Sequence, residues 1–81
     1  MYYVYILIDD NNEIYIGYTA NLDRRMLEHE TKRVLTTKQM ENPRLYYYEA
    51  YNNEKQAKER EGKLKQFGSS YMGLMKRIGL K

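Results

Sequence analysis

The stretch YIGYTANLDRRMLEH, residues 15–29, decides the fold. Its first residues are mostly aromatic or β-branched, which predicts a strand, and Asn21 is well suited to cap the helix that follows. Helical spacing then places four residues on one face of this helix, namely Leu22, Arg25, Met26 and His29. The two apolar members indicate that this face packs on the sheet. An arginine and the only histidine of the chain are therefore expected beside the sheet, and they need a chemical reason.

The residues before and around this stretch predict a β-hairpin. The segments are a strand at 2–8, a turn at 9–12 and a returning strand at 13–19. The first strand, YYVYILI, is apolar on both faces, as is typical of a central strand. A three-residue loop pairs Asp9 with Glu13 and turns Tyr5 and Tyr15 toward the same face. A two-residue loop turns these tyrosines toward opposite faces, and the sequence leaves both registers open.

The remaining pattern predicts one more strand and two more helices. The expected segments are a first helix from Asn21 to about Lys32, a connection at 33–43, a strand at 44–51, a helix from Asn53 to about Phe67, and a last helix from Ser69 or Ser70. Gly68 and Gly79 are expected to end the last two helices. The order is ββαβαα. We therefore expect an α+β fold with a three-stranded central sheet flanked by helices, in one domain over residues 1–81.

The composition narrows the possible chemistry. With no cysteine and one histidine in 81 residues, a disulfide, a thiolate zinc site and a cysteine nucleophile are excluded, whereas a carboxylate site for a hard cation stays open. The apolar run at 2–8 is too short for a signal peptide or a membrane span, so we expect a cytoplasmic protein with no membrane partner. A net charge of +3 is a weak indication of an anionic partner, and ten tyrosines agree with a surface for nucleic acid.

A second polar residue interrupts the apolar stripe of the helix at 53–67. That stripe is formed by Ala57, Leu64 and Phe67, and Glu61 lies in its middle. Pairing with Lys65, four residues later, contributes only a few tenths of a kcal/mol and does not explain a carboxylate there. Because two helices each carry charge on the inner face, we expect one shared polar site.

These residues form a known pattern. The segments are YVY at 3–5, YIG at 15–17, R-x-x-x-H at 25–29 and the glutamate in REGKLK at 60–65. The pattern resembles the GIY-YIG nuclease superfamily, which includes the nuclease domain of the UvrC excision-repair protein. The short chain is similar to the bacterial single-domain, excinuclease-like group. The resemblance extends from Tyr3 to about Phe67, and it implies metal-dependent hydrolysis of a phosphodiester in nucleic acid.

The resemblance assigns roles to the residues of the two tripeptides and of the first helix. Tyr5 and Tyr15 match the tyrosines of the first and second motifs. Gly17 matches the motif glycine, which implies a close approach of substrate backbone. His29 matches a position that is histidine in many members and tyrosine in others. A free tyrosine has a pKa near 10, so Tyr5 as a general base needs a nearby cation that favours its phenolate, with His29 assisting the proton transfer.

Three residues are assigned to neutralise the negative charge of the phosphate or to bind the substrate. By resemblance, Arg25 contacts the scissile phosphate, and a guanidinium suits this role because it offers a fork of donors. Glu61 matches the single metal-ligating glutamate and would hold Mg²⁺ or Mn²⁺. Lys65 is expected to bind substrate.

The expected function is therefore a metal-dependent endonuclease on nucleic acid, on DNA rather than RNA, in repair or recombination. Many nucleases of the superfamily carry an asparagine near the end of the domain, and this chain has none after Asn53. The alternative is a catalytically weak or inactive binding module on the same fold, with phosphates contacted by Lys55, Lys58, Arg60, Lys63 and Lys65. A weak homodimer through the third strand or the last helix is a further alternative.

Overall fold

The element order of the protein matches the expected ββαβαα. The computed structural model describes residues 1–32, 37 and 39–80, so part of the connection predicted at 33–43 lies outside the described residues. The elements are β1 (Tyr2–Ile8), β2 (Ile14–Thr19), α1 (Leu22–Glu30), β3 (Arg44–Tyr51), α2 (Glu54–Lys65) and α3 (Ser69–Arg77). Within the described residues, no helix has the length and apolar character needed to cross a membrane.

The three strands form one antiparallel sheet in the order β2-β1-β3. The central position of β1 confirms the expectation from its sequence, because a strand that is apolar on both faces is stable only when both faces are covered. Val4 and Ile6 point to one side and Tyr5 and Leu7 to the other, and all four side chains are buried. The two faces of β1 therefore contact different halves of the protein.

The hairpin between β1 and β2 has the three-residue loop. The backbone N–H of Asp9 donates to the carbonyl of Glu13 at 3.1 Å, and Leu7 pairs with Tyr15 in the ladder. The buried carboxylate of Asp9 also accepts hydrogen bonds from the backbone N–H groups of Asn11, Glu13 and Glu41, at 2.8–3.0 Å. The carboxylate thus joins the hairpin loop to the segment that precedes β3.

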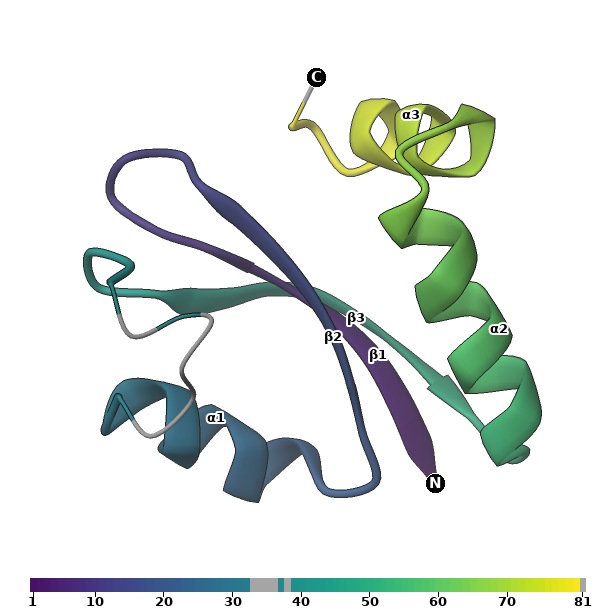
Figure 1. The fold of residues 1–81 in the computed structure, drawn as a ribbon, viewed down its shortest axis with the longest axis horizontal. Coiled ribbons are helices and arrows are strands. Elements are labelled where there is room, and N and C mark those ends of the chain that lie inside the picture. The colour runs from purple at the N-terminus through teal and green to yellow at the C-terminus, as the bar shows by residue number, and fades with distance from the viewer. Residues whose placement is uncertain (33–36, 38, 81) are drawn as a thin grey trace.

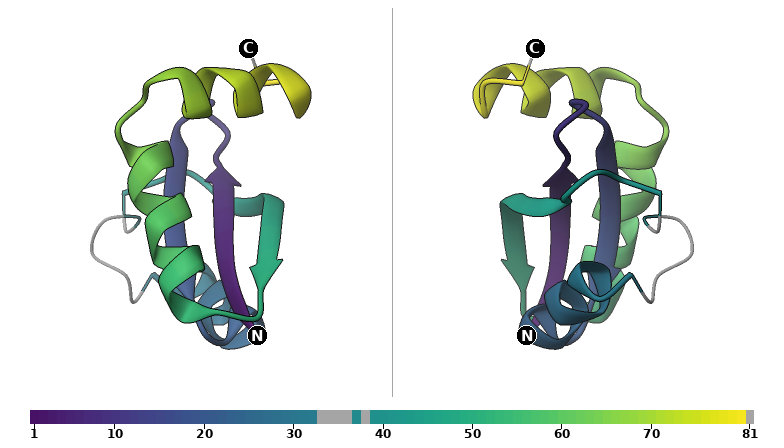
Figure 2. Two further views of the ribbon diagram at one scale, coloured as in Figure 1. Left: turned by 90° about the vertical axis from the view of Figure 1, so that its right-hand side faces the viewer. Right: turned by 90° about the vertical axis from the view of Figure 1, so that its left-hand side faces the viewer.

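The helices lie on opposite faces of the sheet. Figure 1 shows the sheet between α1 and α2, and in Figure 2 α2 stands before the strands in the left view and α1 in the right view. The apolar core is on the α2 and α3 side, where the buried cluster is Val4, Ile6, Ile16, Ala57, Leu64, Tyr71, Leu74 and Met75. The α1 side carries much less apolar packing, which leaves that face for polar groups.

The helix termini follow the expected capping residues with one exception. The side chains of Asn21 and Asn53 accept the backbone N–H three residues later, as predicted. Gly79 has a φ of 86° just after α3. Gly68, however, does not end α2 in the left-handed conformation, because Phe67 takes it with a φ of 57°. Gly68 instead precedes the first turn of α3.

The position of Phe67 corrects the predicted apolar stripe of α2. The helix ends at Lys65, so Phe67 no longer continues the line of Ala57 and Leu64, and its side chain is 61% exposed. Its ring packs edge-on against Tyr71 at a centroid distance of 4.8 Å. Phe67 therefore covers the corner between α2 and α3 from outside the core.

A pair of alanine substitutions tests this correction. Leu64→Ala should lower the free energy of unfolding by about 2–5 kcal/mol, because it leaves a cavity in the fully buried cluster. Phe67→Ala should change it by less than about 1 kcal/mol, since the side chain is largely exposed. Urea denaturation followed by circular dichroism measures both. Equal losses in the two variants would contradict the structure.

Candidate active site

The contact between α1 and the sheet is made through a histidine. His29 is 2% exposed, whereas Leu22 and Met26, which the sequence indicated as the packed residues, are only half-buried. The buried imidazole faces two tyrosine rings of the sheet. A buried polar ring requires hydrogen-bond partners, and α1 is placed where the sheet and the following segment provide them.

A continuous chain of hydrogen bonds passes through this imidazole. The hydroxyl of Tyr5 lies 2.8 Å from His29 Nε2, and Oγ1 of Thr37 lies 2.7 Å from His29 Nδ1. Tyr5 and Thr37 are both 0% exposed. The sequence indicated Tyr5 and His29 but gave no reason to select Thr37, which lies in the predicted connection and has no periodic pattern around it.

Tyr15 completes an aromatic cluster around His29. The ring centroids of Tyr5 and Tyr15 lie 5.6 Å and 5.3 Å from the imidazole and 6.1 Å from each other. Both tyrosines therefore point to the α1 face, as the three-residue loop requires. Edge-on arrangements of this kind are favourable between aromatic rings.

Gly17 makes the cluster possible. A Cβ at this position would lie 2.4 Å from Cζ and the hydroxyl oxygen of Tyr5 and 2.9 Å from Cε2 of Tyr15. The ladder between β1 and β2 has no shift here, so the glycine does not mark a bulge. The close approach is that of the Tyr5 phenol from the neighbouring strand. An approach of substrate backbone at Gly17 stays a prediction.

Arg25 links the buried cluster to the solvent. Its Nε donates to the Tyr5 hydroxyl oxygen at 3.4 Å, and its Nη1 donates to Oε1 of Glu28 at 2.9 Å. The side chains of Arg25 and Glu28 are 34% and 32% exposed. The guanidinium therefore lies directly above Tyr5, with its outer edge accessible to a ligand.

The electrostatics of the cluster keep Tyr5 protonated and His29 neutral. Burial raises the pKa of Tyr5 to about 12, and the hydrogen bond from Arg25 only partly opposes this effect. Burial, together with the charge of Arg25, lowers the pKa of His29 below its usual value. At neutral pH the phenol can thus donate to an unprotonated imidazole nitrogen. The two groups are thus held as a neutral donor and a neutral acceptor beside the charge of Arg25.

Glu61 lies apart from this cluster. It belongs to α2, on the other face of the sheet, and its carboxylate contacts the ammonium of Lys65 at 3.2 Å. Glu61 shares a helix face with Glu54 and Lys58, which both contact Tyr18 of β2, so it lies toward the β2 side of α2. None of the contacts among the described residues joins Glu61 to the cluster. The expectation of one shared polar site is therefore not met by direct contact.

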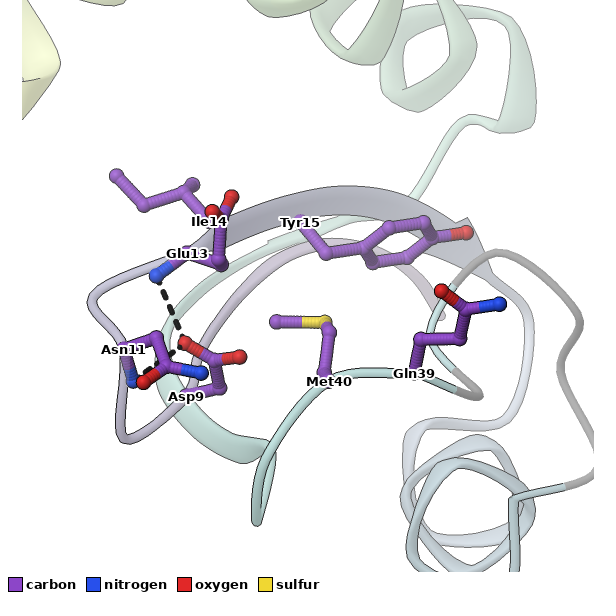
Figure 3. Close-up of a pocket in the computed structure, with 7 residues that line it drawn as sticks. All are labelled: Asp9, Asn11, Glu13, Ile14, Tyr15, Gln39 and Met40. Atoms are coloured by element: carbon purple, nitrogen blue, oxygen red, sulfur yellow. Dashed lines mark hydrogen bonds between the residues drawn. The ribbon is translucent and has the colours of Figure 1, made fainter.

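A hollow of about 360 Å³ makes Tyr15 accessible from solvent (Figure 3). Its lining residues are Asp9, Asn11, Glu13, Ile14, Tyr15, Gln39 and Met40. The ring of Tyr15 extends along one wall toward Gln39, with Met40 between the ring and the hairpin loop. Tyr15 is thus reachable from outside, whereas Tyr5 is covered.

Metal ligands are sparse in the part of the chain that the structure describes. No group of three or more histidine, aspartate or glutamate side chains there is arranged to hold a metal ion. Glu61 offers one partly exposed carboxylate. One carboxylate with access to water fits Mg²⁺ that keeps most of its hydration shell, and it does not fit an ion held by protein ligands alone.

Replacement of Gly17 tests the packing of the cluster. Gly17→Ala should lower the free energy of unfolding by about 1–3 kcal/mol, because the new methyl group overlaps the Tyr5 phenol. Gly73→Ala is the control, since nothing lies within 4 Å of its added carbon in helix α3. That variant should be about 0.5–1 kcal/mol more stable than the unchanged protein. Thermal or urea denaturation measures both, and a stable Gly17→Ala protein would contradict this geometry.

Comparison with known proteins agrees with this fold. The family model of the GIY-YIG catalytic domain matches residues 1–74. A UPF0213 protein of Staphylococcus haemolyticus is 34% identical over 67 residues, which are 82% of each chain. A UPF0213 protein of Autographa californica nuclear polyhedrosis virus is 42% identical over 48 residues, which are 58% of this chain but only 46% of the viral protein.

A solved structure of a related protein has a similar fold. The solution NMR structure of the UPF0213 protein BH0048 from Bacillus halodurans superposes with a TM-score of 0.59 and 26% identity. The superposition covers 96% of this chain and 85% of the other. The match of the family model to residues 1–74, together with these relatives, shows that the chain belongs to the GIY-YIG family.

Proposed function

We propose that this protein is a metal-dependent endonuclease that hydrolyses phosphodiester bonds in nucleic acid, in DNA rather than RNA, with a role in repair or recombination. The observation that carries the proposal is the hydrogen-bonded group of Tyr5, His29 and Arg25, in which a buried proton donor and acceptor lie beneath an accessible guanidinium. Buried titratable groups with shifted pKa values beside an accessible cation are typical of functional sites.

Phosphate binding is assigned to Arg25. Its guanidinium always carries a positive charge and offers five donors, of which two are used by Tyr5 and Glu28. A phosphate oxygen that replaces Glu28 as the acceptor would bind directly above the Tyr5 hydroxyl. With Arg25 kept beside both groups, its charge also favours the phenolate that Tyr5 needs as a base.

Proton transfer is assigned to Tyr5 and His29. Water becomes a nucleophile when a base takes its proton, and the phenol becomes a base only after it has passed its own proton on. His29 Nε2, at 2.8 Å, is the acceptor in place. Since burial lowers the pKa of His29, the imidazole is neutral at neutral pH, and activity should rise as the pH rises through that lowered pKa.

Metal binding is assigned to Glu61. A divalent ion held there would supply positive charge to the bound strand and a water of lowered pKa. Glu61 and the Tyr5–His29 group lie on different faces of the sheet, and β2 is the edge strand beside both. A substrate strand that contacts Arg25 and Glu61 together would pass around this edge, with Lys65 beside Glu61.

Two ion pairs must open before substrate and metal bind. Arg25 is paired with Glu28, and Glu61 is paired with Lys65. Both pairs are partly exposed, and exposed pairs typically contribute only about 0.2–1 kcal/mol. A phosphate and a divalent ion, which interact more strongly with these groups, therefore displace the partners at little cost.

The second candidate function is binding of nucleic acid without cleavage. The sparse metal ligands and the missing asparagine after Asn53 favour it. The basic residues of α2 give it less support. Arg60 is held by Glu49 through two hydrogen bonds of 2.9 and 3.0 Å, and Lys58 and Lys65 are paired within their own helix. Three of the five expected phosphate contacts thus already have acidic partners.

Cleavage assays decide between the two functions. Branched, single-stranded and duplex DNA and single-stranded RNA are incubated with the protein and Mg²⁺ or Mn²⁺. We expect metal-dependent cutting that Glu61→Ala reduces by at least about 100-fold, because the metal ligand is lost. Glu59→Ala, an exposed change on the same helix, should cut normally. Equal binding by all variants, with no cutting by any, would establish the binding function instead.

The pair of Arg25 and Glu28 gives a separate prediction. Glu28→Gln removes the acidic competitor for the guanidinium and should tighten nucleic-acid binding by about two- to fivefold, as expected for a partly exposed pair. Asp23→Asn makes the same change in net charge on the same helix without touching Arg25. Fluorescence anisotropy with a labelled oligonucleotide measures the dissociation constants. The assignment of Arg25 fails if both variants tighten binding equally.

A further inference from the structure

Thr37 is a fully buried hydroxyl at the end of the hydrogen-bond chain. It is 0% exposed, and its Oγ1 lies 2.7 Å from Nδ1 of the equally buried His29. The contact joins the segment after α1 back to that helix. The mechanism above uses the other ring nitrogen of His29 and leaves this contact without a role.

Donation from Arg25 leaves the Tyr5 proton available to a second partner. A guanidinium can only donate, so the Tyr5 oxygen accepts from Arg25 Nε. The partners beside the hydroxyl are Tyr15 and His29 Nε2, and the tautomer of the imidazole decides whether Nε2 can accept. An imidazole that accepts at Nε2 and is neutral carries its proton on Nδ1. This proton is donated to Thr37 Oγ1.

We propose that Thr37 is a positioning residue for the proton transfer: its hydroxyl oxygen holds His29 in the tautomer and ring orientation in which Nε2 accepts the Tyr5 proton. The proposal rests on the proposed function. In the transfer, the O–H bond of Tyr5 breaks and an N–H bond forms at Nε2, which leaves a phenolate on Tyr5 and an imidazolium on His29; the phenolate then takes the proton of the attacking water. The proton on Nδ1 stays in place, and Thr37 neither gains nor loses one.

A neutral partner at Nδ1 suits the charges around His29. The groups that face the imidazole are Tyr5 of β1, Tyr15 of β2 and Arg25 and Glu28 of its own helix. Glu30 and Arg44 also line a second hollow, beside the ring of His29. A carboxylate at Nδ1 would favour the imidazolium and fill Nε2 with a proton before catalysis. A hydroxyl orients the ring without adding charge, so Nε2 of His29 stays unprotonated and can accept a hydrogen bond.

The tautomer can be measured in the protein without substrate. His29 is the only histidine of the chain, so its ¹⁵N NMR signals need no assignment against others. We expect a single tautomer with the proton on Nδ1 at neutral pH, and a titration midpoint below the usual value. A proton on Nε2 would overturn the proposal, because that nitrogen could not accept from Tyr5. A midpoint above the usual value would also overturn it, because the imidazole would then be protonated on both nitrogens near neutral pH.

Two substitutions separate positioning from simple packing. Thr37→Val keeps the shape and removes the acceptor, and it should lose the single tautomer. Thr37→Ser keeps the hydroxyl and should retain it. If Thr37→Val keeps the Nδ1 tautomer, Thr37 only fills space. If Thr37→Val does not fold, the proposal is tested by the tautomer of the unchanged protein and of Thr37→Ser. A Thr37→Ser protein without the single tautomer would contradict the proposal.

Kinetics give the independent measurement. On the nucleic acid that the unchanged protein cuts, Thr37→Val should lower kcat by about 10–100-fold with little change in KM, as expected when a residue that orients a functional histidine is lost. Thr37→Ser should restore most of the rate. A protein that cuts no substrate would refute the proposed function alone, since the NMR result still decides whether Thr37 sets the tautomer. Normal kcat in Thr37→Val would overturn the proposal.

Discussion

The hydrogen bond between the Tyr5 hydroxyl and the His29 imidazole is the interaction on which the α1 face of the protein depends. Both groups are buried, so each needs its partner, and removal of one leaves a polar group whose burial costs about 1–3 kcal/mol. The bond explains why α1 packs through a histidine although Leu22 and Met26 share its inner face. It also explains the glycine at position 17, since the phenol occupies the space of a side chain there.

One face of the sheet carries the apolar core, and the other carries the polar candidate site. The apolar cluster beneath α2 and α3 contributes most of the buried hydrocarbon, so that side stabilises the fold. The other side is free to hold a polar group with perturbed pKa values, which is typical of functional sites. In the free protein Arg25 is paired with Glu28, and on the other face Glu61 is paired with Lys65. Under the proposed function, substrate and metal would replace these partners.

Most of the fold and part of the candidate site could be predicted from the sequence. Asn21 and Asn53 cap the expected helices because capping depends on residues three positions apart. Tyr5, Arg25 and His29 were selected because polar groups on a packed helix face and a motif tyrosine stand out in the sequence, and the structure brings these three together. The separation of Glu61 from this group could not be predicted, since it depends on which face of the sheet each helix covers.

The sequence by itself determined the order of elements and the central position of β1, because periodicity, caps and apolar runs act within a few residues of the chain. Only the tertiary structure decided the three-residue loop, the exposure of Phe67 and the contact of Thr37 with His29. Each of these depends on how segments distant in the chain meet in space. The bond between Tyr5 and His29 spans 24 residues, and no local pattern fixes such a distance.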